Sequence, residues 1–122
     1  MKVLLAFDGS EASVDALERT VERAADAGDE LTVAITDPDP EADSREALAE
    51  RAESLVADTE LSVTVRHVEG QPGSELVAIA ESEAFDEIVL GGNTTSPMGK
   101  ISIDQTAEFV LLNSHITVTL VR

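Results

Sequence analysis

The segment EIVLGGNTTSPMGK (residues 87–100) joins a short apolar run to a loop of glycine and small polar residues. The apolar run predicts a buried β-strand, and the residues after the loop predict a helix over 102–113. A glycine-rich loop between a strand and a helix points free backbone N–H groups and the positive end of the helix dipole at one place. This stretch therefore predicts a strand-loop-helix unit that resembles a phosphate-binding cradle.

Apolar runs alternate with amphipathic segments through the rest of the chain. We expect strands over 2–7, 30–36, 61–68, 87–90 and 115–122, and helices over 11–27, 44–58, 75–84 and 102–113. Ser10 and Ser74 are expected N-caps, and Gly28 is expected to end the first helix. This alternation predicts an α/β fold, a doubly wound, Rossmann-like, five-stranded parallel sheet with helices on both faces. Ligands of such folds bind beyond the carboxyl ends of the strands.

The composition, with 43% hydrophobic residues, fits a single domain over residues 1–122. The chain has no cysteine, which excludes disulfides, thiolate nucleophiles and zinc-thiolate sites. No apolar run approaches the roughly 20 residues that a membrane span needs. We therefore expect a cytoplasmic protein.

The chain is strongly acidic, with 25 acids, 8 bases and a net charge of −17. Such a field repels nucleic acid and anionic membranes, so neither is an expected partner. The acids are dispersed along the amphipathic segments and lysine is scarce, which resembles proteins of salt-adapted (halophilic) organisms. We expect the self-repulsion to lower stability in dilute buffer.

Four stretches resemble the universal stress protein family, and together they run nearly from end to end. They are VLLAFDGSEAS (3–13), the Glu69-Gly70-x-Pro72 turn, IVLGG (88–92) and GKISIDQTAEFVLLNSHITVTLV (99–121). The resemblance implies strand order 3-2-1-4-5, an adenine nucleotide alpha hydrolase-like arrangement. It also implies a stress-response or regulatory role without catalysis, and a homodimer formed through the last strand.

In its nucleotide-binding branch the family holds ATP with a G-x2-G-x9-G-(S/T) motif, assisted by an Asp at the end of strand one. Asp8 and Gly91 match this pattern, but Thr94, Asp104 and Gln105 stand at its other three positions. The chain therefore resembles a member with a degenerate nucleotide loop. The candidate nucleotide-binding residues are Asp8, Gly91, Gly92, Thr94, Gly99 and Lys100.

Asp104 has three open interpretations. It could occupy the anion site itself in place of a phosphate, or hold Mg²⁺ against the phosphates of ATP. It could also be an exposed acid in the first turn of a helix that Ser102 caps. Asp8 likewise either assists a nucleoside or only shapes the Asp-Gly-Ser turn.

Two functional hypotheses follow from these residues. The first is a dimeric stress-response or regulatory module that does not bind ATP tightly by the usual motif. The alternative is an ATP-binding switch with a modified phosphate loop and Mg²⁺. For the dimer, an uncovered last strand would pair with another chain, with Ile116, Val118 and Leu120 as interface residues. A monomer whose edge is protected by Arg122 and nearby acids is the other possibility.

Overall fold

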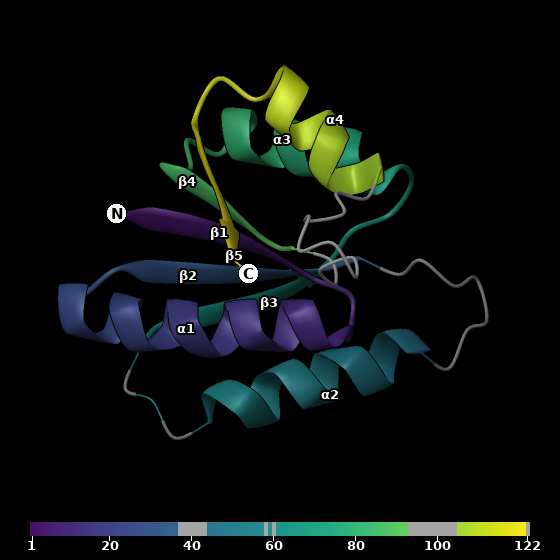
Figure 1. Cartoon of the computed structure of the whole chain (residues 1–122). Coiled ribbons are helices and arrows are strands. Elements are labelled where there is room, and N and C mark those ends of the chain that lie inside the picture. Colours follow the sequence, from purple (N-terminus) through teal and green to yellow (C-terminus); the bar gives the residue numbers. More distant parts are fainter. Residues whose placement is uncertain (37–43, 58, 60, 93–104, 122) are drawn as a thin grey trace, which may run out of the picture.

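Five parallel strands form the central layer of the computed structural model, which describes residues 1–36, 44–57, 59, 61–92 and 105–121 (Figure 1). The strands are β1 (Lys2–Phe7), β2 (Glu30–Ile35), β3 (Val63–His67), β4 (Glu87–Gly91) and β5 (Thr117–Val121). Their order in the sheet is β3-β2-β1-β4-β5, which confirms the predicted fold class and strand order. The sheet order reverses direction between β1 and β4, and β3 and β5 form its two edges.

Four helices cover the two faces of the sheet. They are α1 (Glu11–Ala27), α2 (Ser44–Val56), α3 (Pro72–Ser82) and α4 (Gln105–Asn113). In Figure 1, α1 and α2 lie on one face, and α3 and α4 lie on the other. No helix in the described ranges has both the length and the apolar character needed to cross a membrane.

The central strand β1 contributes to both layers of the core. Val3, Leu5 and Phe7 pack in the cluster on the side of α1 and α2. Leu4 and Ala6 pack in the cluster on the side of α3 and α4. Because neighbouring side chains of a strand point to opposite faces, a strand between two helical layers must be apolar at every position.

Helix α1 begins and ends where the sequence predicts. The Ser10 hydroxyl accepts a hydrogen bond from the backbone N–H of Ser13 at 3.2 Å, as an N-cap does. Gly28 follows the helix with a left-handed backbone, φ +73°, and its N–H donates to the Ala24 carbonyl. Local capping signals are therefore sufficient to define this helix.

The predicted start of α3 was wrong. Ser74 is not the N-cap, because the helix already begins at Pro72 and the Ser74 hydroxyl donates to the Gln71 carbonyl at 3.2 Å. Proline is favourable at the first position of a helix, because its fixed φ is helical and no intrahelical partner exists there for an N–H. Pro72 therefore determines the start, and α3 ends at Ser82 instead of residue 84.

β1 has the predicted bounds and β4 is one residue longer than predicted, whereas β2, α2, β3 and β5 are shorter at their ends. β5 begins at Thr117 because the Ser114 side chain binds the N–H and the carbonyl of Ile116, so Ile116 lies outside the strand. β3 begins at Val63, after a turn in which the Leu61 N–H donates to the Thr59 hydroxyl. Residues 102–104, predicted to begin the last helix, lie outside the described residues.

Candidate functional site

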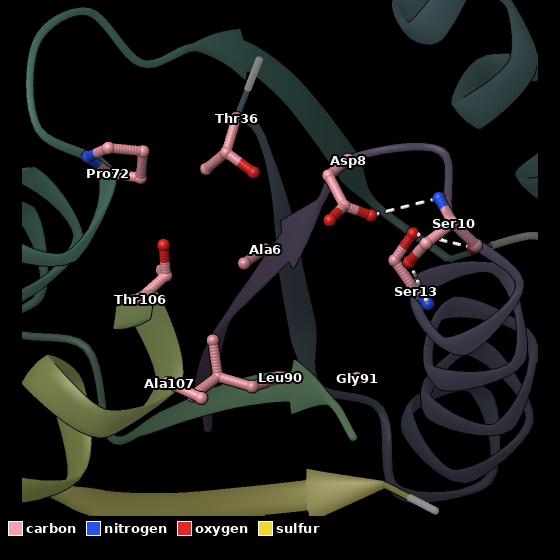
Figure 2. A pocket seen from close by; sticks show the side chains of 10 residues that line it. All are labelled: Ala6, Asp8, Ser10, Ser13, Thr36, Pro72, Leu90, Gly91, Thr106 and Ala107. Carbon is pink, nitrogen blue, oxygen red and sulfur yellow. Dashed lines mark hydrogen bonds between the residues drawn. The ribbon is translucent and has the colours of Figure 1, made fainter. Parts of the chain in front are cut away.

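A pocket lies beyond the carboxyl ends of β1, β2 and β4, where the order of strands reverses. β1 and β4 pair in parallel, so Asp8 and Gly91, which are at the ends of these strands, lie at the same edge of the sheet. The pocket is lined by Ala6, Asp8, Ser10, Ser13, Thr36, Pro72, Leu90, Gly91, Thr106 and Ala107 (Figure 2). This is the position at which α/β sheets bind their ligands.

Asp8 forms part of the turn that leads from β1 into α1. One carboxylate oxygen of Asp8, Oδ1, accepts a hydrogen bond from the Ser10 N–H at 2.9 Å. Gly9 between them has φ +83°, a conformation that is unfavourable for residues with a Cβ. The carboxylate is thus fixed at the pocket wall near the N-terminus of α1, where a negative charge is favoured. Its other oxygen is not used by this turn.

Two threonines complete the polar wall opposite Asp8. Thr36 follows β2, and its N–H donates to the Phe7 carbonyl at 3.0 Å, which keeps Thr36 beside the end of β1. Thr106 lies in the first turn of α4. Figure 2 shows the hydroxyl of Thr36 on the side of Asp8 and that of Thr106 directed into the same space. Within the described residues neither hydroxyl has a hydrogen-bond partner.

Gly91 has a packing role of its own. A Cβ added to Gly91 would lie 2.6 Å from the carbonyl carbon and oxygen of Ala12 and 2.7 Å from the backbone nitrogen of Ser13. These are backbone atoms of α1, so they cannot move aside as a flexible side chain would. The end of β4 can approach the first turn of α1 only with glycine at this position.

The other predicted loop residues are not part of the pocket wall that the structure describes. Gly92 is buried, and its N–H donates to the Val121 carbonyl at 2.6 Å, which joins the ends of β4 and β5. The predictions on Thr94, Gly99, Lys100 and Asp104 fall outside the described residues.

Sequence reasoning did not identify Thr36, Pro72 and Thr106 as pocket residues. Each is close to a strand end or a helix start, which is a usual location for binding residues in this class of fold. Their segments are far apart in the sequence, and only the strand order brings them to one pocket. These residues could therefore be identified only by their positions at element ends, once the order of strands in the sheet was known.

The described wall carries hydroxyl groups and one carboxylate, and none of its residues is basic. Within the described ranges, no group of three or more metal-ligating side chains is close enough to hold a metal ion. The two histidines do not line this pocket, and His115 Nδ1 instead lies 2.6 Å from Glu81 Oε1. Such a wall is suited to binding neutral hydroxyl and amino groups by hydrogen bonds.

β5 is an edge strand, as predicted. The side chains of Ile116, Val118 and Leu120, predicted as interface residues, are half-buried against the core on the side of α3 and α4. Part of the apolar surface of these side chains is therefore already buried within the same chain. What the edge offers to a partner is mainly its backbone N–H and carbonyl groups.

Comparison with known proteins gives a family and a fold. The model of the Universal stress protein family matches residues 1–122. The solved universal stress protein from Archaeoglobus fulgidus is similar to this chain, with a TM-score of 0.84 and 20% identity over 100% of this chain and 98% of its own. A comparison with curated protein sequences finds no match.

Two further similar structures contain nucleotides. A universal stress protein in complex with cAMP has a TM-score of 0.79 and 26% identity, covering 100% of this chain and 96% of its own. The universal stress protein from Archaeoglobus fulgidus in complex with dAMP has a TM-score of 0.78 and 16% identity, covering 100% of this chain and 98% of its own.

Proposed function

The chain belongs to the universal stress protein family, and on that premise we propose that it is a small stress-response module whose pocket binds an adenine nucleotide without catalysis. One observation carries the proposal: the Asp8 carboxylate and the hydroxyls of Thr36 and Thr106 face one space at the carboxyl ends of the strands (Figure 2). The complexes of two similar proteins with cAMP and dAMP support it.

The described part of the pocket is suited to the nucleoside end of the ligand. A carboxylate oxygen accepts hydrogen bonds from ribose hydroxyls or an exocyclic amine, and a threonine hydroxyl can donate or accept. The Asp8 carboxylate would repel a phosphate placed next to it, so we propose that Asp8 contacts the nucleoside, which is the uncharged part of the nucleotide. Gly91 enters the site through its backbone at the start of the loop. The N–H of Gly92 is bonded to Val121, and Thr94, Gly99 and Lys100 are the remaining loop candidates.

We further propose that the protein does not bind ATP tightly through the family motif. Asp104 stands where the motif has its third glycine, and Gln105 stands where it has Ser or Thr. A carboxylate about 4 Å from a phosphate costs on the order of 4 kcal/mol at an effective dielectric of 20. Asp104 would then occupy the anion site in place of a phosphate. The double variant Asp104→Gly, Gln105→Ser should raise the ATP affinity in molar KCl, and an unchanged affinity would overturn this assignment.

The alternative function is an ATP-dependent switch, in which ATP binds together with Mg²⁺. A magnesium ion between Asp104 and the phosphates would turn the repulsion into attraction. ATP binding that appears only with Mg²⁺, and that is lost in Asp104→Asn, would favour the switch. Mg²⁺-independent binding of a monophosphate would favour the stress-response module described above.

The site itself is tested by following backbone amide signals in a nuclear magnetic resonance titration with AMP in molar KCl. Saturable shifts are expected at Asp8, Thr36, Gly91 and Thr106. Ribose 5-phosphate, which lacks the base, serves as the matched control and should bind more weakly. Shifts that cluster elsewhere in the protein, or that do not saturate, would contradict the assignment of the pocket.

We also propose that two copies associate through β5. Support comes from its edge position and from a short strand with no proline, whose backbone groups can continue the sheet. Sedimentation in molar KCl should show a concentration-dependent dimer. Val118 allows a matched pair of variants, because its N–H points away from β4 when the backbone of Val121, three residues on, faces β4. Val118→Pro removes this edge donor whereas Val118→Thr keeps it. A monomer at all protein concentrations would contradict the proposal.

A further inference from the structure

A second hollow, with a volume of about 370 Å³, lies between α1 and the edge strand β5. It shares no lining residue with the pocket at the strand ends. Its walls are formed by Arg19, Thr20 and Arg23 of α1 and by Thr119, Leu120 and Val121 of β5. In a chain with only 8 basic residues and a net charge of −17, two arginines at one hollow are an unusual local concentration of positive charge.

Arg23 is held in place at this hollow by a buried carboxylate. Its Nη2 atom lies 2.7 Å from Oε1 of Glu87, whose side chain is only 6% exposed. The other oxygen of Glu87 accepts a hydrogen bond from the Thr119 hydroxyl. The Arg23 side chain remains half-exposed, so the guanidinium is oriented while part of it faces solvent. This is an arrangement in which an arginine is preorganised for a further acceptor.

Arg19 lies one helical turn before Arg23, so both side chains are on the same side of α1. Within the described residues Arg19 forms no ion pair, although the exposed Asp15 and Glu22 lie one turn away on the same helix. Like charges at this spacing repel each other weakly. An anion between the two guanidinium groups would remove the repulsion and would use N–H donors that have no partner in the part of the chain that the structure describes.

We propose that this hollow binds a phosphate-type oxyanion through Arg19 and Arg23. Guanidinium groups form parallel N–H···O bonds to phosphate oxygens, which makes them better suited to this ligand than lysine. Both charged residues that line the hollow are arginines, while the exposed Asp15 and Glu22 of α1 lie outside the lining. The buried Thr20 is also part of the lining. The ligand is inorganic phosphate or the terminal phosphate of a small metabolite, and the site is separate from the proposed nucleotide pocket.

The test is a titration of the protein with inorganic phosphate at constant high ionic strength, followed through the backbone amide signals and the arginine Nε–Hε signals. Saturable shifts of the Arg19 and Arg23 signals in the millimolar range are expected. The variant Arg19→Gln should weaken the affinity about tenfold or more, because it removes one of two charged donors without touching the Glu87 pair. Arg51→Gln, which changes an exposed arginine on α2, is the matched control and should leave the affinity unchanged.

Two results would overturn the proposal. Shifts that do not saturate and that affect all arginines alike would indicate an adventitious ion only. Shifts at Thr36 and Thr106 without shifts at Arg19 would place the phosphate in the pocket at the strand ends. The second result leaves the proposed nucleotide site intact, so failure of one proposal is distinguishable from failure of the other.

Discussion

Gly91 lies so close to the first turn of α1 that a Cβ atom on it would be 2.6 Å from the carbonyl carbon and oxygen of Ala12. The glycine that best matches the family's nucleotide motif is therefore required by the packing of a strand end against a helix. A glycine in this place does not by itself indicate a bound phosphate. The case for a nucleotide rests instead on Asp8, Thr36 and Thr106.

The packing role of Gly91 predicts a stability effect without any ligand. Gly91→Ala should destabilise the fold by about 2–3 kcal/mol, since an added methyl group meets backbone atoms. Gly28→Ala is the matched control, because Gly28 has φ +73° but nothing within 4 Å of the added Cβ. It should cost about 1 kcal/mol through backbone strain alone. Urea denaturation in molar KCl measures both, and equal effects would contradict the packing argument.

The ion pair between Arg23 and Glu87 predicts that β5 depends on a side chain of α1. Arg23→Gln leaves the buried Glu87 carboxylate without its charged partner and should cost about 2 kcal/mol. Arg19→Gln changes an arginine of the same helix that has no ion pair among the described residues, and should stay within about 0.5 kcal/mol. Hydrogen exchange should show the β5 amides losing protection in Arg23→Gln. Unchanged protection of β5 would contradict the role given to this pair.

Asp8 can be tested without disrupting its turn. In Asp8→Asn the amide oxygen still accepts the bond from the Ser10 N–H, so the fold is expected to persist. AMP affinity should fall about tenfold, because a charge-assisted hydrogen bond is replaced by a neutral one. Glu11→Gln removes a neighbouring exposed charge outside the pocket and should leave the affinity unchanged. Equal affinity of Asp8→Asn and the unaltered protein would assign Asp8 to the turn alone.

The net charge of −17 predicts that salt stabilises the fold. At about 1 M salt the Debye length is about 3 Å, so most repulsion between dispersed acids is screened. The melting temperature should therefore rise steadily between dilute buffer and molar KCl. Sucrose at matched osmolarity, which is uncharged, separates screening from solute exclusion. A melting temperature that does not change with KCl would contradict the electrostatic explanation.

The order and type of the elements could be predicted because they rest on local signals and on one family resemblance. Ser10 and Gly28 define α1 through capping bonds within a few residues of each end. The errors occur where two local signals compete. At α3, Pro72 is favourable as the first helical residue and Ser74 is favourable as an N-cap. The helix begins at Pro72, so Ser74 lies inside its first turn.

The candidate site was only partly predictable, since it depends on contacts between distant segments. Asp8 and Gly91 could be placed together once the strand order was expected. Thr36 and Thr106 could not, because nothing in their own sequence neighbourhoods distinguishes them from other threonines. The Arg23–Glu87 pair is of the same kind, since it joins α1 to β4 across 64 positions of sequence.

Equilibrium dialysis against AMP and ATP in molar KCl, with and without Mg²⁺, measures which nucleotide the pocket binds. We expect one AMP bound per chain in a saturable manner, with ATP bound at least about tenfold more weakly because its extra phosphates meet Asp104. ATP bound more tightly than AMP, or retained stoichiometrically through purification, would contradict this expectation.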